Sequence, residues 1–175
     1  MESRPPIELF DHCPRCGAAM GAREATHRIR CGACGLVYYF NPTVSAVAFI
    51  FRPDGRVLFV RRSKEPAKGR LGPPGGFIDI GERAEEAVER EVREEVNLRL
   101  DRVRFLCSQP NRYGYLGVEY PVLDLYFTAR ALDPERAQAL DEVEDVQWLD
   151  PRAVDLEELA FPSMVAAMKV LLERV

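Results

Sequence analysis

The segment from residue 82 to residue 95, ERAEEAVEREVREE, constrains the fold most, because it places carboxylates where a helix should be apolar. It contains no Gly or Pro and therefore predicts a helix. At about 100° per residue, one face of this helix is formed by Ala84, Ala87 and Val88. Glu91 and Glu95 project from that same face, and Glu94 flanks it. Inward carboxylates are costly unless a cation compensates them, so the pattern predicts a divalent metal at the edge of a cleft.

The composition indicates one globular domain with a small appendage. The chain has 175 residues, 47% of them hydrophobic and 30% charged, which is enough apolar material for a core. The chain contains no run of about 18 apolar residues, so no membrane span is expected, and residues 1–17 lack an apolar signal region. The net charge of −4 argues against broad binding to nucleic acid. We therefore expect a cytoplasmic protein with no membrane partner.

Four of the five cysteines form two Cys-x-x-Cys pairs, each followed by Gly, at Cys13, Cys16, Cys31 and Cys34. Two such turns complete a tetrahedral site with no open position, which predicts a structural Zn²⁺ in a zinc ribbon at residues 1–40. A disulfide pairing would need an oxidising compartment, and a thioredoxin-like pair would need only one motif. His12 and His27 are interpreted as bystanders, because four thiolates fill the metal shell.

The remainder, residues 42–175, predicts a mixed β-sheet between helices, an α/β or α+β arrangement. Besides the acidic helix, the expected strands and the C-terminal helix are at residues 44–52, 56–62, 102–108, 120–131, 143–149 and 163–174. The stretch from residue 63 to 77, rich in Lys, Pro and Gly, is interpreted as a loop.

The acidic helix lies within a longer pattern that begins at Gly76. After five residues comes Glu82, and after seven more comes Arg90-Glu91-Val92-Arg93-Glu94-Glu95, followed by Val96-Asn97-Leu98. This spacing resembles the box of the Nudix family, and every fixed position matches except Asn97, where the family has Gly. Asn tolerates the left-handed conformation that ends a helix, so it is a suitable substitute.

The resemblance implies a Nudix hydrolase, a pyrophosphatase that cleaves a nucleoside diphosphate linked to another moiety with Mg²⁺ or Mn²⁺. It implies that Glu91 and Glu95 are the main metal ligands, with Glu94 as a further ligand and the Gly75 carbonyl as an additional one. Gly75 and Gly76 would lie close to substrate. Arg90 and Glu82 would form an ion pair that fixes the helix against the preceding loop. The candidate catalytic residues are thus Glu82, Arg90, Glu91, Glu94 and Glu95.

The general base stays open at this point. In the family it is either a glutamate of the box or one on a distant loop. Glu142 and Glu144, in the acidic stretch just before Trp148, are the candidates for a distant base. Their alternative interpretation is an ordinary exposed loop.

A zinc ribbon ahead of a Nudix domain is similar to the NADH pyrophosphatases, which carry Ser-Gln-Pro-Trp-Pro-Phe-Pro after the box. This chain has Ser108-Gln109-Pro110 but lacks the aromatic half, so ADP-ribose and FAD are equally compatible substrates. Tyr113 and Tyr115 could stack on a purine or be buried in strands. The alternatives are a nucleotide sensor that does not cleave its ligand, and an enzyme that processes capped RNA. A homodimer is expected by resemblance.

Overall fold

The computed structural model describes residues 4–21 and 25–175, which form two compact units. The first unit comprises Met1–Thr43 together with Arg112–Pro121. It contains a short helix, η1 (Pro6–Leu9), and two strands, β1 (Arg28–Arg30) and β2 (Val37–Tyr39), which pair in antiparallel register. Arg4 forms a parallel bridge with Val118, and its backbone N–H donates to the Gly117 carbonyl at 3.1 Å. The two segments of this unit are therefore joined by backbone hydrogen bonds.

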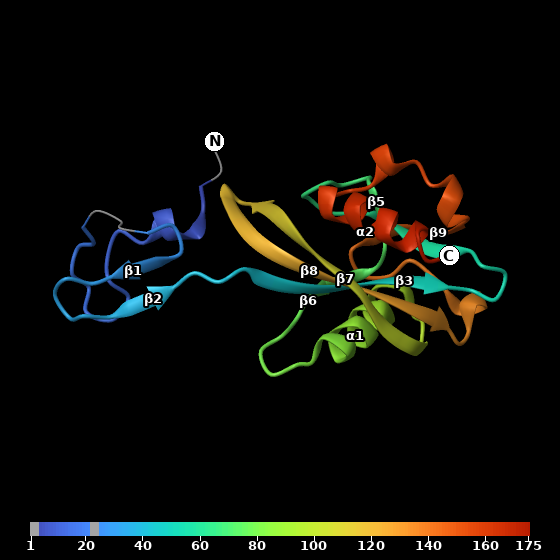
Figure 1. The fold of residues 1–175 in the computed structure, drawn as a ribbon, viewed down its shortest axis with the longest axis horizontal. Helices are drawn as coiled ribbons and strands as arrows, with labels where there is room; N and C mark the ends of the chain where they lie inside the picture. Colours follow the sequence, from blue (N-terminus) through green and yellow to red (C-terminus); the bar gives the residue numbers. More distant parts are fainter. Residues whose placement is uncertain (1–3, 22–24) are drawn as a thin grey trace. The chain divides into compact units, whose positions relative to one another are not determined.

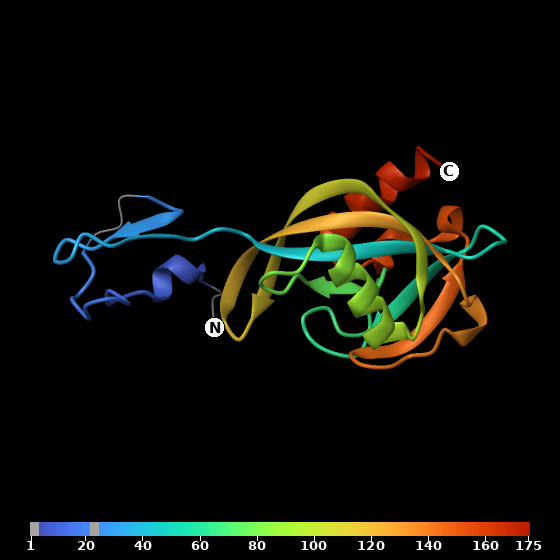
Figure 2. The ribbon, with the colours of Figure 1, turned by 90° about the horizontal axis from the view of Figure 1, so that it is seen from below.

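The second unit, Val44–Asn111 with Val122–Val175, is built on one seven-stranded sheet. Its strands are β3 (Thr43–Phe51), β4 (Val57–Arg62), β5 (Leu71–Gly72), β6 (Gly75–Phe77), β7 (Leu100–Tyr115), β8 (Val118–Ala131) and β9 (Val143–Leu149). The order is β5-β4-β3-β8-β7, with β6 added to β3 and β9 added to β4. Figure 1 and Figure 2 show α1 and α2 on opposite faces of this sheet. The predicted arrangement of a sheet between helices, preceded in sequence by a small cysteine-bearing module, is present.

The first face of the sheet is covered by α1 (Ala84–Val96). The helix buries Ala87, Val88, Val92 and Val96 completely. They pack with alternate residues of β3 and β4, namely Ala46, Ala48, Ile50, Leu58 and Val60. At its C-terminus Asn97 has φ 56° and ψ 32°, the left-handed conformation expected for the residue that replaces Gly. The helix therefore forms from the apolar spacing and ends where the sequence predicts.

The opposite face of the sheet is covered by α2 (Pro162–Leu172). Met164, Ala167, Met168 and Leu171 pack with the other set of alternate strand residues, namely Val47, Phe49, Val57 and Phe59. The period of two along β3 thus divides its side chains between two cores. Short 3₁₀ turns precede α2 and are η2 (Pro134–Arg136), η3 (Pro151–Ala153) and η4 (Leu156–Glu158).

Two parts of the sheet differ from the sequence interpretation. β7 runs from Leu100 to Tyr115, well beyond the expected 102–108, because it forms a long hairpin with β8. β5 and β6 lie inside the stretch interpreted as a loop. These strands are two and three residues long and carry glycines, so no alternation of apolar residues signals them. Within the described residues, no helix has the length and apolar character needed to cross a bilayer.

Candidate active site and cysteine cluster

β6 brings two glycines against the middle of β3. Gly75 pairs with Val47 and Gly76 with Ala46. Gly75 has φ 146°, and a Cβ at this position would collide with the Ala46 carbonyl oxygen. A Cβ on Gly76 would lie 2.5 Å from Oε1 of Glu91. Glycine at these two positions therefore lets the strand pack against β3 on one side and against the Glu91 carboxylate on the other.

Glu95 is held at the same strand. Its Oε2 accepts a hydrogen bond of 3.0 Å from the Gly75 backbone N–H, and the side chain is half-buried. Burial raises its pKa to about 8, the Gly75 N–H opposes that change, and the neighbouring Glu91 adds to it. Burial likewise raises the pKa of Glu91, although Arg90 opposes this. Two partly buried carboxylates with raised pKa values thus lie beside the two glycines, and each would be stabilised by a bound cation.

Arg90 connects the helix to the segment before it. Its Nε and Nη2 donate to the two carboxylate oxygens of Glu82 at 2.9 and 3.0 Å, a two-point pairing. Nη1 donates to Glu91 Oε1 at 2.8 Å and to Glu94 Oε2 at 3.2 Å, and Nη2 also donates to the Phe77 carbonyl at 3.1 Å. The hydrogen bond from Arg90 lowers the pKa of Glu82. The Arg90–Glu82 ion pair anticipated from the sequence is present, and it ties α1 to the end of β6.

Glu94 occupies a different environment from the other box glutamates. Its side chain is 55% exposed, and its carboxylate forms an ion pair with Arg90, whereas the Glu95 carboxylate accepts a hydrogen bond from β6. Within the described part of the chain, no three carboxylates have ligand oxygens within 4.8 Å of one another. The structure therefore brings Glu91 and Glu95 to Gly75 and Gly76, and leaves Glu94 on the solvent side of Arg90.

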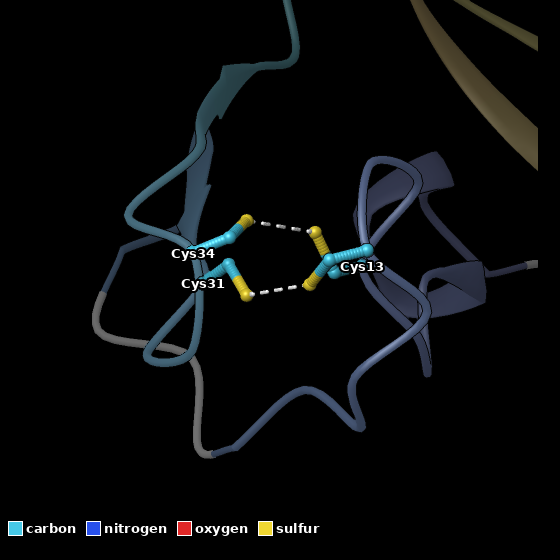
Figure 3. A group of neighbouring side chains, drawn as sticks. Cys13, Cys31 and Cys34 are labelled. Carbon is cyan, nitrogen blue, oxygen red and sulfur yellow. Dashed lines mark hydrogen bonds between the residues drawn. The ribbon is translucent and has the colours of Figure 1, made fainter.

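The four cysteines of the first unit converge on one point (Figure 3). Their sulfur atoms all lie within 4.8 Å of one another, with Cys13 to Cys34 and Cys16 to Cys31 each at 3.7 Å. Four thiolates about 2.3 Å from a tetrahedral zinc ion would be separated by about 3.8 Å, so the spacing fits Zn²⁺. Backbone N–H groups of Cys34 and then Ala33 lower the pKa of Cys31 to about 6, which favours the thiolate. No His, Asp or Glu among the described residues joins this group.

The two cysteine turns have the same backbone geometry. The Gly17 N–H donates to the Cys13 carbonyl at 2.9 Å, and the Gly35 N–H donates to the Cys31 carbonyl at 3.0 Å. Both glycines have positive φ, 74° and 72°. The glycine after each pair therefore permits the turn that directs two sulfurs to one side.

Residues 41–171 match the family model of the NUDIX domain, and residues 10–39 match that of the NADH pyrophosphatase zinc ribbon domain. This chain belongs to the Nudix family.

Named relatives carry related chemistries. An NAD-capped RNA hydrolase NudC from Stutzerimonas stutzeri is 32% identical over 137 residues, which cover 78% of this chain and 46% of that protein. An ADP-ribose pyrophosphatase from Methanocaldococcus jannaschii is 34% identical over 128 residues, covering 70% of this chain and 69% of that protein. A NUDIX hydrolase structure from Nitrosomonas europaea superposes with a TM-score of 0.72 at 22% identity, covering 94% of this chain and 92% of that one. The chain spans about half the length of the NudC relative.

Within the Nudix domain, Glu142 and Glu144 lie in different surroundings. Glu142 forms an ion pair of 2.9 Å with Lys64, and its charge contributes to the raised pKa values of both Glu91 and Glu95. Its carbonyl accepts the Ser63 backbone N–H at 3.0 Å. Glu144 is an exposed residue of β9. The structure thus associates Glu142 electrostatically with the box.

Tyr113 and Tyr115 belong to the outer part of the β7–β8 hairpin, which groups with the N-terminal unit rather than with the Nudix box. Their role as substrate contacts therefore stays a prediction. The sequence analysis missed Arg62, whose charge acts on Glu95 and opposes its raised pKa. No sequence signal identifies it, because it precedes the box by one strand and a loop.

Proposed function

We propose that this protein is a metal-dependent pyrophosphohydrolase that cleaves a nucleoside diphosphate linked to another moiety, of the NADH, ADP-ribose or FAD class. The observation that carries the proposal is the placement of Glu95, a half-buried carboxylate on the Gly75 backbone N–H with Glu91 beside it. Family membership supports the same reaction class. Substrates of this class present a pyrophosphate, whose clustered negative charge must be neutralised before water can attack phosphorus.

The donor set fits Mg²⁺ or Mn²⁺. Both ions prefer oxygen ligands, and Glu91 and Glu95 supply carboxylates that burial makes costly to ionise without a cation. We propose these two as the principal ligands, with the Gly75 carbonyl as another. Glu94 would serve as a further ligand after release from Arg90. A bound ion supplies charge neutralisation of the pyrophosphate and acidification of a water molecule.

The remaining box residues, Arg90 and Glu82, orient the metal ligands and do not contact the reacting atoms. Arg90 holds Glu82 with two hydrogen bonds and Glu91 with one, which fixes the orientation of the ligand carboxylate. Glu142 is the preferred candidate for the distant general base, since its charge reaches both Glu91 and Glu95. In this role it would accept the proton of the attacking water while Lys64 orients it. Glu144 is the weaker candidate.

A second substrate class is RNA that carries an NAD cap. It is favoured by the similarity to the NAD-capped RNA hydrolase NudC and by the match of residues 10–39 to the zinc ribbon domain of NADH pyrophosphatases. Such a cap contains the same pyrophosphate as free NAD, so the same carboxylates would serve both substrates. The chain's charge of −4 makes the free dinucleotide the primary proposal.

The test is a substrate panel of NADH, ADP-ribose, FAD and NAD-capped RNA with Mg²⁺ or Mn²⁺, scored by release of nucleoside monophosphate. Glu95→Gln should lower turnover by about 10²–10³-fold, as loss of one transition-state stabilising group does elsewhere. Glu89→Gln, on the exposed side of the same helix, is the matched control and should leave turnover unchanged. Binding of a nucleotide with no turnover of any panel member would instead identify a sensor.

Two further expectations belong to this proposal. A cytoplasmic location agrees with four free thiols gathered to bind metal rather than paired as disulfides. We also propose a homodimer, which size-exclusion chromatography with light scattering tests directly.

A further inference from the structure

A cavity of about 640 Å³ lies in the Nudix domain, away from the box. It is bounded by the end of β3 and its turn, by β7 and β8, and by the end of α2. Figure 1 shows the turn after β3 and the C-terminus at the same end of this unit. Phe51, in the cavity wall, lies four residues along β3 from Val47, which pairs with Gly75. At about 3.3 Å per residue this is a separation of about 13 Å.

The cavity concentrates positive charge. No Asp or Glu is among the described residues that line it. Five arginines do line it, namely Arg52, Arg102, Arg104, Arg130 and Arg174. This is unexpected in a chain of net charge −4, because like charges in one concave site repel one another. An arginine cluster of this kind is the arrangement that recognises phosphate.

Three of these arginines have no acidic partner. Within the described residues, no carboxylate oxygen lies within 4.0 Å of a guanidinium nitrogen of Arg104, Arg130 or Arg174. The other two are paired, Arg52 with Asp54 at 3.2 Å and Arg102 with Asp101 at 3.5 Å. The three unpaired side chains are exposed, so their donors are available to a ligand that enters the cavity.

The backbone at Arg102 provides an independent observation. Arg102 has φ 53° inside strand β7, a left-handed conformation that a long side chain adopts at a cost in free energy. Residues held in this region cluster at ligand sites and switch regions. Arg102, which has this conformation, is one of the five arginines that line the cavity.

The rest of the wall is apolar and partly aromatic. Leu106, Ala129 and Leu171 are buried, and Phe105 is 57% exposed with its ring packed edge-on against Phe127. The buried leucines offer an apolar surface for the nucleoside of a ligand, while the arginines hold its phosphates. The volume lies in the usual range for small-molecule sites, roughly 300–1,000 Å³. An RNA chain would favour an extended basic track over a concave site of this size.

We propose that this arginine-lined cavity binds a nucleoside diphosphate or triphosphate at a second site, separate from the Nudix box. The phosphates lie against Arg104, Arg130 and Arg174, and the nucleoside packs on the apolar part of the wall at Leu106 and Leu171. The site does not depend on hydrolysis at the box, since none of its lining residues belongs to the box.

The test is calorimetric titration of ADP into the full chain at low ionic strength without added divalent cation. Arg104→Ala with Arg130→Ala should weaken ADP binding at least tenfold, whereas Glu95→Gln should leave it unchanged. The matched control is Arg136→Ala with Lys169→Ala, two exposed cationic residues outside the cavity, which should bind ADP as the unaltered chain does. Inorganic pyrophosphate should bind at least threefold more weakly than ADP, because it lacks a base.

Several results would overturn the proposal. Unchanged ADP affinity in the Arg104/Arg130 variant would remove the cavity as the site. Pyrophosphate binding equal to or tighter than ADP binding would remove the nucleoside from the assignment. Binding of a twelve-residue RNA without binding of ADP would identify a nucleic-acid surface. A lowered thermal midpoint in the variant, with no ADP binding to the unaltered chain, would mean that the arginines only complement the negative end of α2.

Discussion

Glu95 carries most of the argument at the scale of single residues. Its carboxylate accepts the Gly75 N–H and is half-buried beside a second glutamate, so its ionisation is costly in the absence of a metal. The inward projection of Glu91 and Glu95 follows from helical periodicity alone. Their approach to Gly75 and Gly76 does not, because it depends on β6 pairing with β3, a contact that no local pattern encodes.

Without Mg²⁺ or Mn²⁺ at the box, the protein should become less stable as the pH rises. The pKa of Glu95 is raised from an ordinary 4.5 to about 8, so the folded state holds a proton that the unfolded state has released. The resulting stabilisation is fully present below about pH 4.5 and is lost as the pH rises to about 8. Urea unfolding of the zinc-loaded chain without Mg²⁺ or Mn²⁺, between pH 5 and 8.5, should show this decline, and Glu95→Gln should reduce it. Equal pH dependence in both proteins would contradict the assignment, whereas Mg²⁺ should restore stability at high pH.

Arg90 should matter to stability far more than other arginines of the same helix region. Arg90→Ala leaves Glu82 and Glu91 partly buried without their cation, and we expect a loss of about 2–3 kcal/mol in the free energy of unfolding. Arg90→Lys should recover only part of this, because an ammonium cannot pair with both oxygens of Glu82 at once. The control is Arg83→Ala, whose side chain is 75% exposed and whose removal should change stability far less. Chemical denaturation measures all three, and a similar loss from Arg83→Ala would contradict this account.

At the scale of elements, the two glycines of β6 should respond differently to alanine. In Gly75→Ala the new methyl meets the Ala46 backbone at a positive φ of 146°, so we expect a loss of about 2–3 kcal/mol or more in stability. In Gly76→Ala the atoms nearest to the methyl are those at the end of the Glu91 side chain, which can move. That variant should fold but lose about 100-fold in turnover, because the displaced carboxylate is a proposed metal ligand. Thermal unfolding measures the loss of stability, and the substrate assay measures the loss of turnover. An equal loss of stability in Gly75→Ala and Gly76→Ala would contradict the prediction.

The elements differ in how well the sequence predicts them. α1, β9 and α2 follow from their apolar periodicity, and Asn97 marks the end of α1 through its tolerance of the left-handed conformation. β5 and β6 are too short and too rich in glycine to carry a periodic signal. The acidic stretch before Trp148 indicates Glu142 only as one of two candidate glutamates. Its charge contributes to the raised pKa values of Glu91 and Glu95, and its carbonyl accepts the Ser63 N–H, a pairing between segments distant in sequence.

At the scale of the whole molecule, the chain divides into two units, and the first is organised around its cysteines. The spacing of the cysteine pairs predicts this cluster. It does not predict that Arg112–Pro121 groups with the N-terminal segment, because the bridge between Arg4 and Val118 joins residues far apart in sequence. The arginine-lined cavity is likewise not predicted by the sequence, since its arginines come from β7, from β8, and from the residues just after β3 and just after α2.

Zinc removal should unfold the first unit without unfolding the sheet. A small ribbon has little apolar core, so its metal supplies much of its folding free energy. Cys13→Ser should lose the zinc, about one ion per chain, and amides of β1 and β2 should lose protection from hydrogen exchange. Those of β3 and β4 should keep it. Cys107→Ser is the control and should retain zinc, since Cys107 lies outside the cluster. Retention of zinc by Cys13→Ser, measured by mass spectrometry of the metal, would contradict the assignment.

The central claim is that the Nudix box of this chain hydrolyses a pyrophosphate bond with a divalent metal. The most direct measurement is phosphorus NMR of ADP-ribose incubated with the protein and Mg²⁺. The account predicts that the pyrophosphate resonances disappear and that those of AMP and ribose 5-phosphate appear in equal amounts, with conversion lost in Glu95→Gln and kept in Glu89→Gln. Intact pyrophosphate resonances after incubation, together with demonstrated binding of ADP-ribose, would contradict it.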